Sequence, residues 1–283
     1  MRSAAWVVGV VAVCLAFPSV APAQKASHPK ASGPSSIPDF SGSWDRVWVI
    51  AGTYDAPPAG VGPGPVMVDP EHPHSGHQEG EQATPWIADF ANPILKPLTR
   101  EIVKRISDNE NIGMSHDDAS ARCWPSGVPQ ILNLRDGLQI LQTKTQLTFL
   151  YSRNQQVRQV YMNVPHSKTV TPSWYGESIG TYEGNTLVVD TIGVSDKSEA
   201  DRFGSPHSDT MHVVERYTPT ADGKTVKVLA MVDDPEFFTM RWYASADYQR
   251  GRPGPSEEII CAENNRVISG GQFPVPTAAK ADF

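Results

Sequence analysis

The chain has 283 residues, enough for one large or two small domains, and a formal charge of −7 from 24 basic against 31 acidic residues. The basic residues are scattered rather than clustered, which argues against a nucleic-acid-binding protein. No glycine-rich phosphate-binding motif stands between a predicted strand and a predicted helix, so we expect neither nucleotide-dependent chemistry nor another cofactor.

The N-terminal 23 residues have the pattern of a secretory signal peptide: a short basic start, an apolar run over residues 4–17, and small residues up to Ala23. The apolar run has about 14 residues, fewer than the ~20 that a membrane-spanning helix needs. Residues 24–38 have almost no apolar side chains to bury and predict a disordered leader. We therefore expect a periplasmic or secreted bacterial protein without a membrane span.

Three cysteines are present, and cleavage of the signal peptide removes Cys14. Two thiols far apart in sequence are most simply a disulfide in an oxidising compartment, so we predict a bond between Cys123 and Cys261. A reactive free thiol is the alternative.

The remaining chain, residues 39–283, reads as one mainly β domain. A strand is predicted over 43–50, and apolar residues at three- and four-residue steps predict an amphipathic helix near 93–108. After Cys123 the apolar period becomes two, and it predicts nine strands over 138–143, 146–152, 156–163, 178–183, 186–192, 212–218, 225–233, 238–245 and 257–263. Strands in such a series favour a lipocalin-like antiparallel β-barrel, because closure removes exposed edges; a β-sandwich is the alternative.

Two polar clusters stand out among these strands. His207 and His212 lie in or beside a loop that enters a strand, and imidazoles suit acid–base chemistry near neutral pH. Asp190 interrupts an apolar strand, where a carboxylate must be exposed, hydrogen-bonded or paired. We predict catalytic roles for these three residues near the mouth and interior of the barrel, although an ordinary strand with a capped turn would give the same pattern.

Weaker candidates surround these clusters. Arg158 and Tyr161 are predicted to bind a substrate, although they fall on opposite faces of one strand. The segment Gly176–Gly180 has the Gly-x-Ser-x-Gly spacing of a serine nucleophile, but a strand rather than a helix follows it, which argues against a serine hydrolase. A His-rich tract holds nitrogen ligands that zinc or copper prefers, in a Pro/Gly-rich setting that favours a solvated loop: His72, His74 and His77.

Several strings resemble a widespread family of exported, largely uncharacterised bacterial proteins. They are the Cys-x-Pro-x-Gly-x-Pro pattern at 123–129, the Glu-Gly-x-Thr-Leu-Val-Val-Asp-Thr string at 183–191, and His-Ser-x-x-x-His-x-x-Glu-Arg at 207–216. The resemblance covers roughly residues 123–265 and implies a common β fold with a site near these strands, in which Trp174, Glu177 and Tyr182 would contact substrate. Glu177 stands where the family has His, and Tyr182 where it has Trp.

A closed sheet of this size encloses either packed side chains or a cavity for one ligand. We expect an exported, cofactor-independent enzyme that acts by proton transfer on a hydrophobic or aromatic small molecule, as a lyase, isomerase or hydratase. A non-catalytic periplasmic binding protein of the same shape is the first alternative. A metal-dependent hydrolase that uses the His-rich tract is the second.

Overall fold

The computed structural model describes residues 37–47, 53–69, 71, 87–111, 116, 118–119, 121–134, 136–252, 254 and 258–261. The predicted signal peptide and nearly all of the predicted leader lie outside the described residues. The weak metal candidates His72, His74 and His77 lie outside them as well.

The described part of the chain contains ten strands and one α-helix. β1 (Gly42–Arg46) precedes α1 (Pro97–Asn111), and a 3₁₀ helix, η1 (Gln130–Asn133), leads into the β-rich remainder. The other strands are β2 (Leu138–Gln142), β3 (Gln146–Tyr151), β4 (Gln156–Met162), β5 (Glu177–Glu183), β6 (Thr186–Ile192), β7 (His212–Pro219), β8 (Thr225–Asp233), β9 (Trp242–Ser245) and β10 (Tyr248–Arg250).

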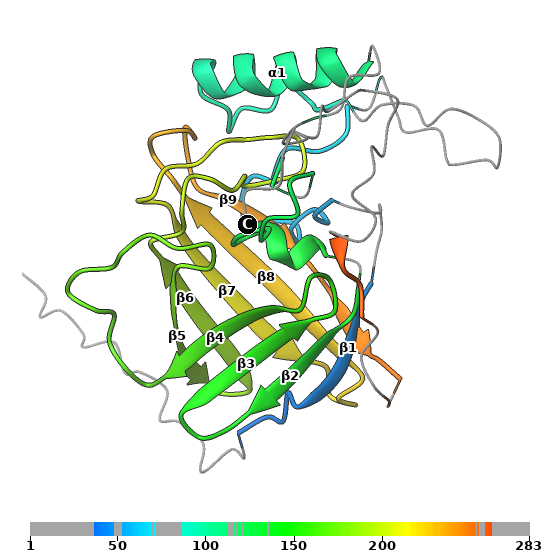
Figure 1. The fold of residues 1–283 in the computed structure, drawn as a ribbon, viewed down its shortest axis with the longest axis vertical. Helices are drawn as coiled ribbons and strands as arrows, with labels where there is room; N and C mark the ends of the chain where they lie inside the picture. The colour runs from blue at the N-terminus through cyan, green and yellow to red at the C-terminus, as the bar shows by residue number, and fades with distance from the viewer. Residues whose placement is uncertain are drawn as a thin grey trace, which may run out of the picture. The chain divides into compact units, whose positions relative to one another are not determined.

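These strands form a closed barrel (Figure 1). Each strand from β1 to β7 pairs with the next one in sequence, and β10 closes the ring by pairing with both β1 and β8. The ring therefore has nine strands, and β9 pairs with β8 beside it. The prediction of a mainly β protein built on a barrel is confirmed, and the β-sandwich alternative is not what the chain forms.

One neighbouring pair departs from the expected antiparallel meander. β4 and β5 run parallel, with Val160 opposite Ser178 and Met162 opposite Gly180, whereas every other strand pair in the described ring is antiparallel. Parallel neighbours need a crossover of about a dozen residues or more, because the chain must return to the starting end of the sheet. Residues 163–176 make this crossover, and we call them the arch.

The predicted strand over 257–263 is not formed by its described residues, 258–261. The last strand of the ring is β10, and Ile259 makes only a single parallel bridge with Arg153 in the turn between β3 and β4. β10 has three residues, too few to show a period of two. β9 also begins four residues later than predicted, because Phe238 bridges Leu95 instead of joining the strand.

The predicted helix is present, but it begins at Pro97 rather than near residue 93. Proline suits the first helical turn, where its missing N–H has no partner to lose. The buried side chains of α1 include Thr99, Val103 and Ile106, and the hydroxyl of Thr99 donates to the carbonyl of Phe237 at 2.6 Å. In the described residues, no helix is long and apolar enough to cross a membrane.

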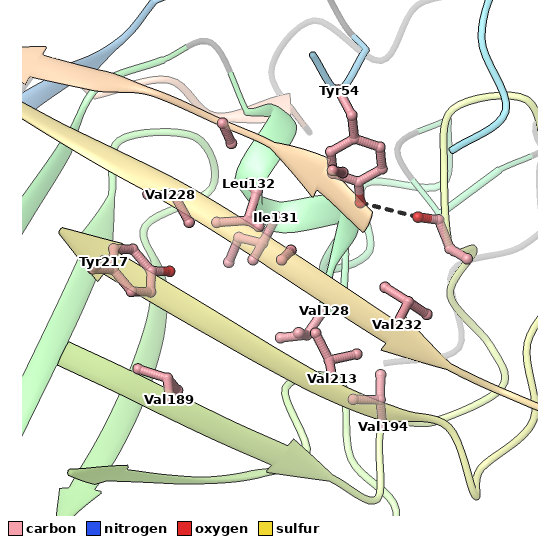
Figure 2. Close-up of a cluster of buried hydrophobic side chains, with 14 of the residues drawn as sticks. Tyr54, Val128, Ile131, Leu132, Val189, Val194, Val213, Tyr217, Val228 and Val232 are labelled. Atoms are coloured by element: carbon pink, nitrogen blue, oxygen red, sulfur yellow. Dashed lines mark hydrogen bonds between the residues drawn. The ribbon is translucent and has the colours of Figure 1, made fainter. Parts of the chain in front are cut away.

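The barrel interior is packed with side chains, as the strict alternation of buried and exposed residues in β4 illustrates. Val128, Ile131 and Leu132, from the segment that contains η1, are fully buried and lie beside residues of β7 and β8 (Figure 2). The hydroxyl of Tyr248 donates to the carbonyl of Leu132 at 3.0 Å and ties this segment to β10. The sequence left open whether the barrel encloses packed side chains or a ligand cavity, and in this region it encloses packed side chains.

Cys123 and Cys261 form the predicted disulfide, with their Cα atoms 5.5 Å apart. The backbone N–H of Cys261 donates to Asn154 Oδ1 at 2.8 Å, and the N–H of Asn154 donates to the carbonyl of Ile259. The bond therefore joins the Cys123 loop to residues 259–261, which are hydrogen-bonded to the turn between β3 and β4 and are not part of a barrel strand.

Asp201 is a buried acid in the loop between β6 and β7. Its Oδ1 accepts hydrogen bonds from the N–H groups of Phe203 and Ser205 at 2.8 and 3.2 Å, whereas Oδ2 has no partner among the described residues. Burial raises the pKa of Asp201 to about 6, although these hydrogen bonds act in the opposite direction.

The Asp201→Asn variant is expected to retain more stability than the wild type as the pH rises. The pKa of about 6 in the folded state, against an ordinary value of 3.8, means that folding favours the protonated acid. This contribution to stability is fully present below about pH 4 and is lost as the pH rises through about 6. Relative to the variant, the wild type should lose about 3 kcal/mol between pH 4 and pH 8. Urea denaturation of both proteins at three pH values measures the difference, and parallel pH profiles would contradict the raised pKa.

Candidate functional site

An ion pair between Arg158 and Glu215 lies inside the barrel, and neither side chain is exposed. Successive side chains of a strand point to opposite faces, and Arg158 of β4 and Glu215 of β7 both belong to the buried, inward-facing set. Arg158 Nη1 donates to Glu215 Oε1 at 3.0 Å and Nη2 to Oε2, while the other donors reach the hydroxyls of Ser178 and Thr191. The structure therefore places Arg158, a predicted substrate-binding residue, among the core groups and out of contact with solvent.

Asp190 and His212 point away from the interior. Their side chains are each 37% exposed, whereas Val189 and Val213, their neighbours in β6 and β7, are fully buried. The expectation that Asp190 and His212 line the barrel interior is wrong. β6 carries apolar residues on both faces, so its sequence does not reveal which face is inward.

His166, in the arch, joins these outer side chains into one cluster. Its Nδ1 lies 2.9 Å from Glu177 Oε1, and its Nε2 lies 3.0 Å from Asp190 Oδ1. His212 Nε2 lies 2.8 Å from the same oxygen of Asp190. We call Glu177, His166, Asp190 and His212 the imidazole–carboxylate chain.

Glu177 begins β5 and is fixed by the arch. The backbone N–H of Ser167 donates to Glu177 Oε1 at 2.7 Å, and the Ser167 hydroxyl donates to Oε2 at 2.5 Å. These two hydrogen bonds, followed by the contact with His166, lower the pKa of Glu177, so its carboxylate is ionised at neutral pH.

A groove of about 520 Å³ lies between the arch and the outer face of β4 and β5. The parallel pairing creates it, because the arch must run back over the outward-facing side chains of β4 to reach the start of β5. The lining residues are Val157, Gln159, Tyr161, Thr169, Val170, Thr171, Ser173, Tyr175, Gly176, Glu177 and Ser178. Glu177 therefore belongs both to the groove and to the imidazole–carboxylate chain.

The far end of the arch is fixed to the segment after β6. The N–H of Ser173 donates to the carbonyl of Gly193 at 3.0 Å, and the N–H of Ser195 donates to the carbonyl of Ser173 at 2.8 Å. Gly176 then turns the chain into β5 with φ +61°, and a Cβ there would stand 2.3 Å from the carbonyl oxygen of Ile192. Both ends of the arch are thus held against the barrel.

Ser178 is not placed as a nucleophile. It lies within β5, and its buried hydroxyl accepts from Arg158 and is 2.9 Å from the hydroxyl of Thr191. A nucleophilic serine in a Gly-x-Ser-x-Gly motif needs an exposed hydroxyl at a strand-to-helix turn. This finding agrees with the sequence, which argued against a serine hydrolase.

His207 lies apart from the imidazole–carboxylate chain. Its buried ring lies 2.9 Å from the Ser198 hydroxyl through Nε2 and 2.8 Å from the carbonyl of Ser208 through Nδ1. Burial lowers the pKa of His207, which favours the neutral ring. Of the three predicted catalytic residues, Asp190 and His212 thus contact each other, whereas His207 contacts neither of them.

The three predicted aromatic ligands have different environments. Tyr161 is 44% exposed and lines the groove. Trp174 precedes the groove residue Tyr175, but its ring packs against Trp124 with centroids 5.6 Å apart. The hydroxyl of Tyr182, toward the other end of β5, accepts from Gln142 Nε2 at 3.0 Å.

Sequence reasoning missed His166 and Ser167 as members of a site. Their only local signal is a polar pair just after a predicted strand. The carboxylates that they contact, Glu177 and Asp190, lie 10 to 24 residues later, and the contacts depend on a crossover that spacing does not reveal.

The described residues contain no group of three or more His, Cys, Asp or Glu side chains placed to hold a metal ion. The adjacent carboxylates of Asp233 and Asp234, where β8 ends, have other partners. Asp233 accepts from Arg241 Nε at 2.7 Å, and Asp234 accepts from the N–H of Ser208 at 2.6 Å. Both carboxylates are therefore used to hold the turn at the end of β8.

Comparisons with known proteins do not extend this picture. No family model, no curated protein and no solved structure matches the chain. A function is therefore inferred from the geometry and chemistry of the site alone.

Proposed function

We propose that this chain is an exported protein that binds a small molecule in the groove beneath the arch. The observation that carries the proposal is Glu177, an ionised carboxylate that lines the groove and is held in one orientation by Ser167 and His166. A few fixed polar groups on a preformed concave surface are typical of small-molecule sites, and the groove volume lies within their range of about 300–1,000 Å³.

Export is supported by two features. The N-terminal sequence has the pattern of a cleavable signal peptide, and the disulfide between Cys123 and Cys261 suits an oxidising compartment. We therefore assign the protein to the periplasm or the extracellular medium of a bacterium.

The state of Glu177 favours binding over proton transfer. A general base works best when its pKa lies near the working pH, whereas hydrogen bonds from Ser167 hold the pKa of Glu177 below its ordinary value. Glu177 is thus better suited to accept a hydrogen bond from a ligand than to remove its proton.

The contact between Asp190 and His212 favours a second candidate, an acid–base enzyme such as a lyase, isomerase or hydratase. Asp190 holds Nε2 of His212, and the half-exposed ring has no hydrogen-bond partner at Nδ1 among the described residues. A carboxylate that orients an imidazole is the arrangement of a general base. In this reading Asp190 is a positioning residue and His212 transfers the proton.

Filling the groove is expected to abolish ligand binding. Val157→Trp places a large ring on the groove floor, whereas Leu141→Trp places the same ring on β2, away from the groove and at a similar exposure of 48% against 44%. Mass spectrometry of small molecules retained through native purification should find a compound with the wild type and with Leu141→Trp, but not with Val157→Trp. Equal retention by both variants would contradict the groove as the site.

The same compound separates the two candidates. A binding protein returns it chemically unchanged after prolonged incubation. An enzyme converts it, and Asp190→Asn or His212→Gln should then slow the conversion by about 100-fold or more while the compound still binds. Conversion that both variants leave unaffected would exclude the Asp190–His212 pair from the chemistry.

A further inference from the structure

The groove lining is rich in hydroxyl groups and lacks cations. Six of its eleven residues carry a hydroxyl, and none is Lys or Arg. The hydroxyl of Ser178 faces the core and that of Tyr175 donates to Gln156 Oε1 at 2.7 Å, whereas the other four hydroxyl-bearing residues are exposed. The side-chain hydroxyls of Thr169 and Thr171 have no hydrogen-bond partner among the described residues, and both residues are exposed.

The hydrogen bonds of Glu177 define what this carboxylate can still accept. Oε1 accepts from both His166 Nδ1 and the backbone N–H of Ser167, whereas the one partner of Oε2 within the described part of the chain is the Ser167 hydroxyl. A carboxylate oxygen has two lone pairs, so Oε2 retains one for a further donor. The ligand must therefore present an O–H or N–H group at this position.

Gln159 and Tyr161 add complementary groups on the groove floor. The Tyr161 hydroxyl donates to Gln159 Oε1 at 2.9 Å, which leaves Gln159 Nε2 as a donor and the Tyr161 oxygen as an acceptor. The groove floor thus offers both a donor and an acceptor. Half-exposed Val157 and the ring of Tyr161 supply an apolar surface between them.

From this lining we infer that the groove takes a neutral, hydroxyl-rich ligand such as a short saccharide; the inference rests on the proposed binding function. Each sugar hydroxyl both donates and accepts, which matches the mixed lining, and the C–H face of a sugar ring packs on an aromatic or aliphatic surface. An anionic ligand would bring a like charge to Glu177 in a groove whose described lining contains no Lys or Arg.

The test compares neutral and charged sugars of the same shape. Isothermal titration is carried out with maltose, cellobiose and lactose, with the same disaccharides oxidised to uronates, and with their amino-sugar counterparts. At least one neutral disaccharide should bind the wild type, and its uronate should bind about tenfold more weakly or worse. Glu177→Gln should bring the two affinities to within about threefold, because it removes the repelling charge but keeps an acceptor oxygen. Glu183→Gln, at the exposed far end of β5, serves as the matched control and should preserve the discrimination.

Three results would overturn the inference. The uronates could bind as well as the neutral sugars, or no saccharide could bind at all. The amino sugars could also bind best, with an advantage that disappears in Glu177→Gln because the attracting charge is gone. The failure of the broader proposal looks different. If the purified compound is lost in Val157→Trp but is not hydroxyl-rich, the groove binds a ligand of another class. If saccharide binding survives in Val157→Trp, the groove is not the site.

Discussion

Glu215→Gln is expected to lower the free energy of unfolding by about 3–5 kcal/mol. The substitution leaves the guanidinium of Arg158 unexposed and without an opposite charge. Burial alone disfavours that charge, and the attraction of Glu215 together with its hydrogen bonds raises the pKa of Arg158 above its ordinary value. Urea denaturation followed by circular dichroism measures the loss.

Two further variants show whether the loss comes from an unpaired buried charge. Arg158→Met combined with Glu215→Gln removes both charges, so the double variant should be more stable than Glu215→Gln alone. Arg216→Gln breaks an exposed pair with Glu183 in the same region, whose side chains are 40% and 59% exposed, and should cost no more than about 0.5 kcal/mol. If Glu215→Gln costs no more than Arg216→Gln, the interior pair does not stabilise the fold in this way.

Removal of the disulfide is expected to cost up to about 5 kcal/mol. Cys123 and Cys261 are separated by 138 residues, and a cross-link over such a loop greatly restricts the unfolded chain. The double variant Cys123→Ser, Cys261→Ser should therefore unfold at a lower urea concentration than the oxidised wild type.

Reduction of the wild type provides the control for this measurement. Its midpoint should shift toward that of the double serine variant, and the same reductant should leave the variant unchanged. A midpoint that is identical in oxidised wild type and double variant would show that the bond adds nothing to stability.

Most of the strands could be predicted because a strand with one buried face shows alternating apolar and polar residues in the sequence. β6 and β8 have the predicted bounds, since each is a β-branched, apolar-rich segment of at least seven residues between turns. β10 was missed because three residues show no period. The parallel pairing of β4 and β5 was missed for another reason: alternation gives the face of each residue but not the direction of the neighbouring strand.

The candidate site could be predicted only in fragments. Asp190 was visible as a carboxylate in an apolar strand and His212 as an imidazole at the start of another, whereas Glu177 was indicated only by the family resemblance. The sequence did not show that these side chains share the outer face of the barrel. Alternation tells which residues of one strand lie on the same face, but not which of the two faces is the outer one. His166 joins them through the arch, whose path depends on the parallel pair.

The pairing of β1 with β10 sets the order in which the barrel can be completed. Trp44 lies opposite Arg250, so the seam joins segments from near the two ends of the described chain. During synthesis the ribosome must release almost the entire sheet before β1 meets its last neighbour, and such long-range contacts form slowly. The cylinder therefore stays open along one edge until β10 has been synthesised.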